Sequence, residues 1–340
     1  MKKLGVMIVG TGWVSGEHIR AFEMTGKAEV VAIVSRKYEK GRAKADEYHL
    51  GDRCKIYTSY EEGLKDPNVD IVVLCTPNDM HCEQTIAAAR AHKHILIEKP
   101  AALTWEDTLR MNDEVKKAGV KSLVGYVLHY NPLFKTAKKL QKEFIGNLEY
   151  AETDYFHRVT SEIPCYEWTC KKSVGGSSLL AGGCHAVDAI RWFMQDDVVS
   201  VYAQSAKMRT DLEYDGTIAI ILKFKHGAVG RVGSSYDFIS PYVFNLNLCG
   251  DKGTLWNDKL WSPSMIPDQR DYMQLPVLTP NSGDVKHHPF PEEDAHFVDC
   301  ILNDVETDCP LSDAVKTQEI VFAADRSAAT GEVIHLPLER

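Results

Sequence analysis

Three groups of residues in this chain have types and spacings that could do chemistry. The first is Gly10-Thr11-Gly12, which ends an apolar run and comes directly before a helical pattern. Glycines let the backbone approach a phosphate, and the N–H groups at a helix start attract its charge together with the helix dipole. The turn predicts a dinucleotide pyrophosphate site, although the usual third small residue falls on Ser15 and Gly16 comes one place late. An ordinary tight strand-to-helix turn is the alternative.

The second group is Glu98-Lys99-Pro100, at the end of a later apolar strand pattern. Pro100 fixes φ and lacks a backbone donor, so we expect the turn to hold the Lys99 ammonium in one place. Lysines at strand ends are mostly solvated. A lysine partly desolvated beside a nicotinamide could instead take a hydroxyl proton as hydride leaves the same carbon, or return it in reduction. We therefore predict that Lys99 is an acid/base catalyst.

The third group follows a glycine-rich stretch over residues 175–183. His185 and Asp188 lie three apart in the helical pattern that begins at Cys184, so they share one helix face. A histidine near a helix start can carry a proton or donate a hydrogen bond to a sugar hydroxyl. A buried structural histidine is the alternative.

The elements around the first two groups alternate between strand and helix over the first 125 residues. Helical periodicity covers residues 16–25, 84–92 and 104–118, and Thr104 with Asp107 forms a capping pattern. Strand patterns cover residues 4–9, 29–34, 70–75, 94–98 and 122–127. This alternation predicts a doubly wound parallel sheet of the α/β class, with ligands beyond the carboxyl ends of its strands.

Residues that follow these strands are the cofactor candidates. At the end of the second strand the sequence reads Ser35-Arg36-Lys37, where a dinucleotide domain usually carries a carboxylate for the ribose hydroxyls. Two cations without a carboxylate favour NADP over NAD, unless this is merely a solvated loop. The predicted cofactor-binding residues are Gly10, Thr11, Gly12, Trp13, Val14, Ser35, Arg36, Thr76, Pro77, Asn78, Glu98 and Lys99.

The pattern changes past residue 145, where alternating strands dominate. Turns at His226-Gly227 and at residues 251–253 indicate two hairpins, helices are expected over 184–194, 292–302 and 313–328, and residues 258–290 are expected to form an irregular loop. The strand patterns cover 148–158, 199–208, 217–225, 229–236, 243–249 and 254–256. We predict a second, α+β domain with a mostly antiparallel sheet.

Length and composition agree with an ordinary globular protein of two domains. The chain has 340 residues, which is more than one hydrophobic core usually serves. Hydrophobic residues make up 44% of it and charged residues 26%, as in ordinary globular proteins. Its net charge of −9 argues against nucleic acid or an anionic membrane as partner. We expect neither a spanning segment nor a signal peptide, and nine scattered cysteines fit reduced thiols in a cytoplasm. Cys165, Cys170, Cys184 and His185 could in principle hold zinc, but their spacing matches no recognised finger, and we expect no metal.

In this order, the motifs resemble those of the Gfo/Idh/MocA oxidoreductase family. That resemblance implies an N-terminal Rossmann domain (residues 1–125), a C-terminal substrate-binding and oligomerisation domain (126–340) with a large, mostly antiparallel sheet, and homodimers or homotetramers packed through that sheet. It also implies NAD(P)-linked oxidation or reduction of sugars, inositols and related polyols, with Lys99 catalytic, His185 facing the substrate and His81 in the cofactor set. The residues that carry it are Gly10-Thr11-Gly12, Thr76-Pro77-Asn78 with His81, Glu98-Lys99-Pro100, Gly125-Tyr126, Tyr130-Asn131-Pro132, His185 with Asp188, and residues 313–331.

The chain departs from the family pattern at one position. The family often has an aspartate four residues before its histidine, where this chain has Ala181. Members with this gap look similar to enzymes that act at C3 of glycosides. Trp168 could stack on a pyranose face, and Lys171 or Lys172 could meet an anionic substrate group, although at least one is expected to be solvated. The predicted substrate-binding residues are Lys99, Tyr126, His129, Tyr130, His157, Trp168, Lys171, His185 and Asp188.

Three functions are compatible with these sequence features. The first is an NAD(P)-dependent dehydrogenase or reductase of a sugar, glycoside or inositol-type polyol. The second is an NAD-dependent enzyme that cleaves glycosides through transient oxidation and elimination. The third, a non-catalytic sugar or dinucleotide sensor, is the least favoured because the sequence shows no output module.

Overall fold

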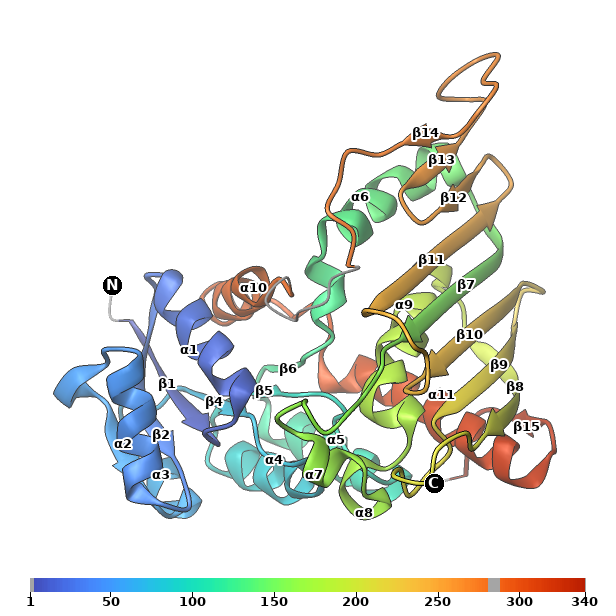
Figure 1. The fold of residues 1–340 in the computed structure, drawn as a ribbon. Coiled ribbons are helices and arrows are strands. Elements are labelled where there is room, and N and C mark those ends of the chain that lie inside the picture. Colours follow the sequence, from blue (N-terminus) through green and yellow to red (C-terminus); the bar gives the residue numbers. More distant parts are fainter. Residues whose placement is uncertain (1–2, 281–287, 340) are drawn as a thin grey trace. The chain divides into compact units, whose positions relative to one another are not determined.

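The computed structural model describes residues 3–280 and 288–339, which divide into two compact units (Figure 1). The first unit comprises residues 1–126 and 289–316, and the second comprises 127–288 and 317–340. The sequence placed everything after residue 125 in one domain, so its assignment of 289–316 was wrong. This segment returns to the first unit because helix α10 (Phe290–Leu302) packs against helix α1 (Trp13–Met24).

The first unit contains a six-stranded, all-parallel sheet in the order β3-β2-β1-β4-β5-β6, which confirms the doubly wound class. The central strand β4 is buried along its whole length, so its sequence is a continuous apolar run. The sequence missed β3, a three-residue edge strand without such a run. The strands are β1 (Leu4–Val9), β2 (Ala28–Val34), β3 (Lys55–Tyr57), β4 (Ile71–Leu74), β5 (His94–Ile97) and β6 (Ser122–Val124).

Helices connect these strands. Helix α5 (Trp105–Ala118) begins where predicted, because the Thr104 hydroxyl accepts the Asp107 N–H at 3.1 Å, and it ends at Gly119 with φ of 66°. The other helical segments between the strands are α2 (Tyr38–Glu47), η1 (Gly51–Arg53), α3 (Tyr60–Leu64), η2 (Asn78–Met80) and α4 (His81–Arg90).

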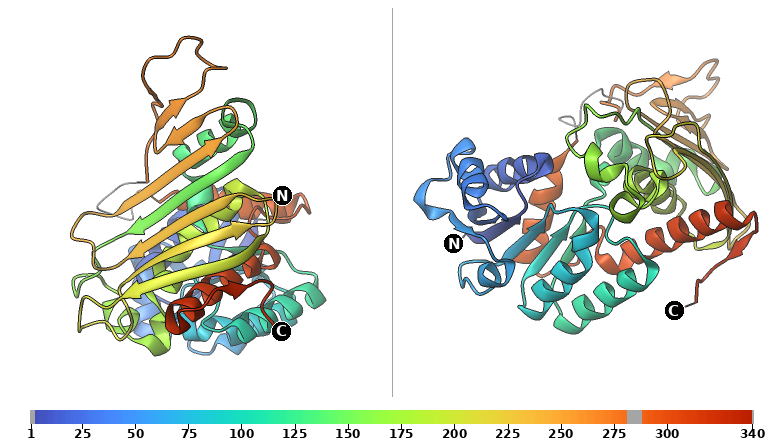
Figure 2. Two further views of the ribbon diagram at one scale, coloured as in Figure 1. Left: turned by 90° about the vertical axis from the view of Figure 1, so that its right-hand side faces the viewer. Right: turned by 60° about the horizontal axis from the view of Figure 1, so that its bottom comes forward.

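The second unit contains a nine-stranded sheet in the order β14-β13-β12-β11-β7-β10-β9-β8-β15, whose strands lie side by side in Figure 2. Every pair is antiparallel except β7 with β10, which confirms the predicted second sheet. The strands are β7 (Leu148–Phe156), β8 (Val198–Ala206), β9 (Thr217–Phe224), β10 (Val229–Ser235), β11 (Val243–Gly250), β12 (Thr254–Trp256), β13 (Lys259–Trp261), β14 (Met273–Gln274) and β15 (Ile334–His335). The predicted irregular loop was wrong at β13 and β14, and its residues 281–287 lie outside the described residues.

One face of this sheet is buried and the other is open. Along β9, Ile218, Ile220, Leu222 and Phe224 are buried, while the alternate residues are wholly or partly exposed. Helix α9 (Cys184–Met194), predicted at the same bounds, packs on β7 and β10. The remaining helical segments are η3 (Val127–Tyr130), α6 (Pro132–Leu140), η4 (Gln141–Ile145), α7 (Tyr166–Thr169), α8 (Lys172–Gly175), η5 (Leu179–Gly183) and α11 (Leu311–Thr330).

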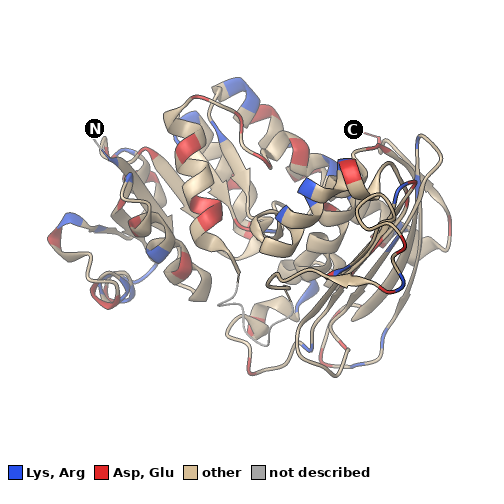
Figure 3. Ribbon diagram, turned by 90° about the horizontal axis from the view of Figure 1, so that it is seen from above, with Lys and Arg blue, Asp and Glu red and all other residues tan. Residues whose placement is uncertain are grey.

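Residues of both charge signs are interspersed along the ribbon of each unit (Figure 3). Within the described part of the chain, no helix combines the length and the apolar character that crossing a membrane requires.

Candidate active site

The glycine turn between β1 and α1 has the backbone of a phosphate cradle. Gly10 has φ of +105°, and a Cβ there would lie 2.6 Å from the Cys75 carbonyl oxygen, so only glycine fits. A Cβ on Gly12 would meet nothing within 4 Å, which leaves an open approach to the start of α1. No side chain caps this helix and its first turn contains no acidic residue, so its first N–H groups suit an anion. These features fit the pyrophosphate of a dinucleotide.

Two neighbouring loops follow β2 and β4. After β2, Ser35 is buried, whereas Arg36 and Lys37 are exposed and available to a phosphate. After β4, the Thr76 hydroxyl donates to Gln84 at 2.6 Å, and Asn78 is buried. These residues therefore occupy the carboxyl ends of their strands, where the cofactor set was predicted.

His81, which was predicted in the cofactor set, lies between the loop after β4 and the turn after β5. Its ring is completely buried, with Nδ1 2.9 Å from the Pro100 carbonyl oxygen and Nε2 3.0 Å from that of Thr76. Burial lowers the pKa of His81 and outweighs the two carbonyls. The buried ring therefore holds the loop after β4 against the turn after β5. The predicted contact of His81 with the cofactor stays a prediction.

The turn after β5 carries Lys99. Lys99 is half-buried between Glu98 and Pro100, both buried, and its backbone N–H donates to Glu98 Oε2 at 3.2 Å. The Glu98 carboxylate is thus part of the turn that places the Lys99 side chain at the carboxyl edge of the sheet.

A buried ionisable cluster, which the sequence analysis missed, lies behind this turn. We name it the His18 cluster: His18, Glu98, Glu293 and Asp294. His18 Nε2 lies 3.0 Å from Glu98 Oε1, and Nδ1 lies 3.0 Å from both carboxylate oxygens of Asp294. Burial alone would lower the pKa of His18, but the two carboxylates raise it well above its usual value. His18 is therefore an imidazolium that donates to both.

The pKa values of the two acids on α10 move upward. Burial raises the pKa of Asp294 to about 6 and that of Glu293 well above its usual value. His18, Glu293 and Asp294 also place one potential metal-ligand atom each within 4.8 Å of one another. To bind a metal ion, His18 would have to lose the Nδ1 proton that it shares with both Asp294 oxygens. The arrangement therefore favours a protonated His18 over a bound metal ion.

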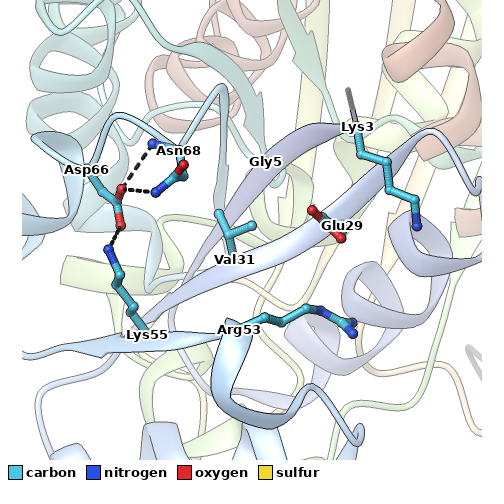
Figure 4. A pocket seen from close by; sticks show the side chains of 8 residues that line it. All are labelled: Lys3, Gly5, Glu29, Val31, Arg53, Lys55, Asp66 and Asn68. Carbon is cyan, nitrogen blue, oxygen red and sulfur yellow. Dashed lines mark hydrogen bonds and ion pairs between the residues drawn. The ribbon is translucent and has the colours of Figure 1, made fainter. Parts of the chain in front are cut away.

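A separate hollow of about 100 Å³ lies at the amino ends of the strands (Figure 4). In it, Asp66 accepts from Lys55 at 2.9 Å and from the Asn68 backbone at 3.0 Å. With Tyr57, these bonds outweigh burial and lower the pKa of Asp66 to about 2. Dinucleotides bind at the opposite, carboxyl edge, so we assign this hollow no part in the site. It is lined by Lys3, Gly5, Glu29, Val31, Arg53, Lys55, Asp66 and Asn68.

In the second unit, the predicted residues His129 and Asp188 form a buried pair. His129 Nε2 lies 2.6 Å from Asp188 Oδ2, and the His129 ring stacks on Trp192 with centroids 4.4 Å apart. The second Asp188 oxygen accepts the Thr317 hydroxyl at 3.0 Å. Because one carboxylate oxygen pairs with His129 and the other accepts from Thr317, Asp188 orients His129. The predicted contact of Asp188 with substrate stays a prediction.

His185 lies one helical turn before Asp188, beside an aromatic group. Its ring is nearly parallel to that of Tyr155, with centroids 6.2 Å apart. Tyr242 packs edge-on against Tyr155 at 5.2 Å and against His157 at 5.7 Å. Burial raises the pKa of Tyr242, so its hydroxyl stays neutral, and no described residue bonds to it. Apolar rings with polar tips suit a sugar, and the sequence missed Tyr155 and Tyr242 because their grouping is tertiary.

The other predicted substrate residues differ in exposure. Trp168 is half-buried in α7, and Lys171 is exposed with Lys172. Tyr126 and Tyr130 are almost entirely buried. Within the second unit, Trp168 and Lys171 are therefore accessible to a ligand, whereas Tyr130 is buried.

Comparison with known proteins agrees with these two units. Residues 4–126 match the oxidoreductase family with an NAD-binding Rossmann fold, and residues 134–256 match the GFO/IDH/MocA C-terminal domain. A 1,5-anhydro-D-fructose reductase of Ensifer adhaerens is 32% identical over 237 residues, 68% of either chain. This chain belongs to the Gfo/Idh/MocA family.

Two further proteins are similar to this chain over most of its length. A myo-inositol 2-dehydrogenase of Thermotoga maritima is 28% identical over 264 residues, 76% of either chain. The WlbA dehydrogenase of Bordetella pertussis, solved with NADH and UDP-GlcNAcA, is 26% identical with a TM-score of 0.83, covering 100% of this chain and 99% of that one. The first unit is therefore an NAD-binding Rossmann domain of an oxidoreductase.

The position where Gfo/Idh/MocA proteins often have an aspartate is apolar here. Ala181, in the π-helical segment η5, belongs to a buried group that we name the Ala181 cluster: Val159, Ala181, Leu212, Tyr214 and Tyr236. A Cβ on the adjacent Gly182 would lie 2.6 Å from the Tyr236 hydroxyl, so the segment is tightly packed. A carboxylate at residue 181 would lose its hydration, and the nearby Arg209 guanidinium is already bonded to Asp211 and to the Val159 and Tyr236 carbonyls. Among the described residues, the cysteines considered for zinc form no group of close ligand atoms.

Proposed function

We propose that this chain transfers a hydride between NAD(P) and a secondary hydroxyl or ketone of a sugar, glycoside or inositol-type polyol, with C3 as the candidate position and Lys99 as acid/base. The observation that carries the proposal is the Glu98-Lys99-Pro100 turn at the carboxyl edge of an NAD-binding sheet. The relatives named as a 1,5-anhydro-D-fructose reductase and a myo-inositol 2-dehydrogenase support this substrate class.

In the oxidation direction, the carbinol C–H bond breaks and its electron pair leaves as hydride. Nicotinamide, when bound, accepts that hydride. The neutral Lys99 amine takes the hydroxyl proton as the C=O bond forms, and the ammonium returns it in the reverse reaction. We propose that His185 donates a hydrogen bond to a substrate hydroxyl, and that the Tyr155, His157 and Tyr242 rings bind an apolar sugar face.

Replacing Lys99 tests this mechanism. The purified enzyme is screened against sugars, inositols and aryl glycosides with NAD and NADP, following nicotinamide absorbance. We expect Lys99→Met to lower kcat about 100- to 10,000-fold, because the proton acceptor is lost, while fluorescence titration shows that the dinucleotide still binds. Lys65→Met, at an exposed lysine of the same unit, is the matched control. Turnover of Lys99→Met like that of the control would contradict the proposal.

The same screen separates two finer alternatives. We propose a preference for NADP, because Arg36 and Lys37 are exposed at the end of β2 and suit a 2′-phosphate. The glycoside-cleaving alternative predicts aglycone release without net change in nicotinamide absorbance. Stoichiometric reduction of the cofactor with an intact glycoside would exclude it.

We also propose that the chain forms a homodimer or homotetramer through the open face of the second sheet. Exposed Tyr202, Ile221, Val229 and Tyr150 lie on neighbouring strands of that face, with Arg231 paired to Glu152 and Asp154 beside them. Contiguous exposed apolar side chains are typical of interaction surfaces. Light scattering should give a multiple of the 38.1 kDa chain mass, and Ile221→Glu should lower it. A wild-type mass of one chain would contradict this.

A further inference from the structure

We propose that His18, held as an imidazolium between Glu98 and Asp294, is a positioning residue that fixes the turn carrying Lys99. The proposal rests on the acid/base role of Lys99 proposed above. It adds a residue outside the sequence motifs, on the helix that follows the glycine turn.

The hydrogen bonds form a continuous chain from α10 to Lys99. Asp294 accepts from His18 Nδ1, His18 Nε2 donates to Glu98 Oε1, and Glu98 Oε2 accepts the Lys99 backbone N–H. A neutral imidazole has one N–H and could donate to only one of the two carboxylates. Only the doubly protonated ring satisfies both, and both contacts are 3.0 Å long. The orientation of the Glu98 carboxylate therefore depends on the proton and the position of His18.

Every charged or titratable group around His18 fits this protonation state. Glu98 faces it from the turn after β5, where the hydrogen bond and the positive charge of His18 outweigh burial and lower the Glu98 pKa. Asp294 and Glu293 face it from α10, and burial keeps Glu293 protonated by raising its pKa. Cys75, after β4, stays a thiol because burial raises its pKa to about 12. The imidazolium thus lies between two carboxylates, with neutral groups on the remaining sides.

Aromatic rings restrict His18 further. The ring of Phe290 packs edge-on against it at 5.1 Å, and that of Phe22 lies 6.4 Å away. The opposite end of the same turn is held by His81 at the Pro100 carbonyl. A buried histidine therefore holds each of the two residues that flank Lys99: His18 bonds to Glu98, and His81 bonds to Pro100. Replacing His18 releases one of these two anchors. Small displacements of a catalytic group can cost about 100-fold in rate.

The test compares His18→Gln with His49→Gln, which changes an exposed histidine of the same unit. We expect His18→Gln to lower kcat about 100-fold while the dinucleotide Kd stays within about twofold, because the glycine turn is unchanged. Nitrogen-15 spectra of the wild-type histidine rings at pH 7.5 should show both His18 nitrogens protonated. A neutral His18 ring, or a kcat for His18→Gln equal to that of His49→Gln, would overturn the proposal.

Asp294→Asn provides a second test if His18→Gln does not fold. This variant keeps an acceptor for His18 Nδ1 but removes the charge that holds its proton. We expect a new fall in kcat as pH rises from 6 to 8, absent from the wild type, whereas a purely structural role would change kcat equally at every pH. A ratio of variant kcat to wild-type kcat that stays the same at every pH would overturn the proposal.

The two proposals can fail separately. If Lys99→Met is inactive and His18→Gln is not impaired, only this inference fails. If Lys99→Met keeps full turnover, the proposed function fails, while the ring spectra still report the state of His18.

Discussion

The His18 cluster and the Ala181 cluster are both buried, yet they are built from opposite chemistry. The first contains three carboxyl groups around one histidine, with hydrogen bonds of 3.0 Å from the ring to Glu98 and Asp294. The second is apolar apart from its tyrosine hydroxyls, and burial raises the pKa of Tyr236. The contrast shows that a buried carboxylate persists in this fold where a cation or a bound proton compensates it.

Placing a carboxylate in the Ala181 cluster is the strongest way to break this contrast. We expect Ala181→Asp to reduce the free energy of unfolding by about 3–5 kcal/mol at pH 8, because the cation beside the cluster, Arg209, is already paired with Asp211. The loss should be smaller at pH 5, where the buried carboxyl group is more readily kept neutral. Thermal unfolding at both pH values measures this.

Ala329→Asp is the matched control, since Ala329 is exposed on α11 of the same unit, away from the open face of the sheet. An equal loss of stability in both variants would show that the Ala181 cluster tolerates charge. The contrast between the two clusters would then be wrong.

Replacing Glu293 of the His18 cluster with a group that cannot titrate gives a smaller, pH-dependent effect. The pKa of Glu293 is raised above its ordinary value of 4.5, so the folded chain keeps a proton that the unfolded chain releases as pH rises. The contribution of Glu293 to wild-type stability therefore falls with increasing pH above about 4.5, by about 1.4 kcal/mol for each unit by which its pKa is raised. The amide in Glu293→Gln does not titrate, so the Tm of this variant relative to the wild type should increase from pH 4 to pH 8.

Glu292→Gln changes the preceding residue, which is exposed, and should leave this Tm difference independent of pH. A constant difference for Glu293→Gln as well would mean that Glu293 is ionised in the folded protein. The charge account of the His18 cluster would then need a second cation.

The sequence predicted most elements because their hydrophobic patterns are local. Buried parallel strands such as β4 are continuous apolar runs, and α9 lies within the predicted bounds. The strands β3, β13 and β14 have only two or three residues, too few to show a period. Patterning also predicted helix α10 but not its partner, because the contact between His18 and Asp294 joins residues 276 positions apart.

The His18 cluster nevertheless leaves a sequence signal. On α1, His18 stands in the same buried stripe as Ser15, Ile19 and Phe22. On α10, Glu293 and Asp294 occupy core positions of a stripe that includes Phe290 and Phe297. Ionisable residues in the apolar stripes of two helices predict that these helices satisfy each other. In the candidate site, the motif residues were predictable, whereas the His129–Asp188 pairing and the Tyr155 and Tyr242 rings depend on tertiary packing.

The return of residues 289–316 to the first unit has a consequence for dissecting this protein. A fragment ending at residue 126 would lack α10, exposing the side of α1 that it covers and depriving His18 of its Asp294 acceptor. The nucleotide-binding half is therefore not a portable N-terminal module. A chimera that exchanges this half with a relative must transplant both segments together.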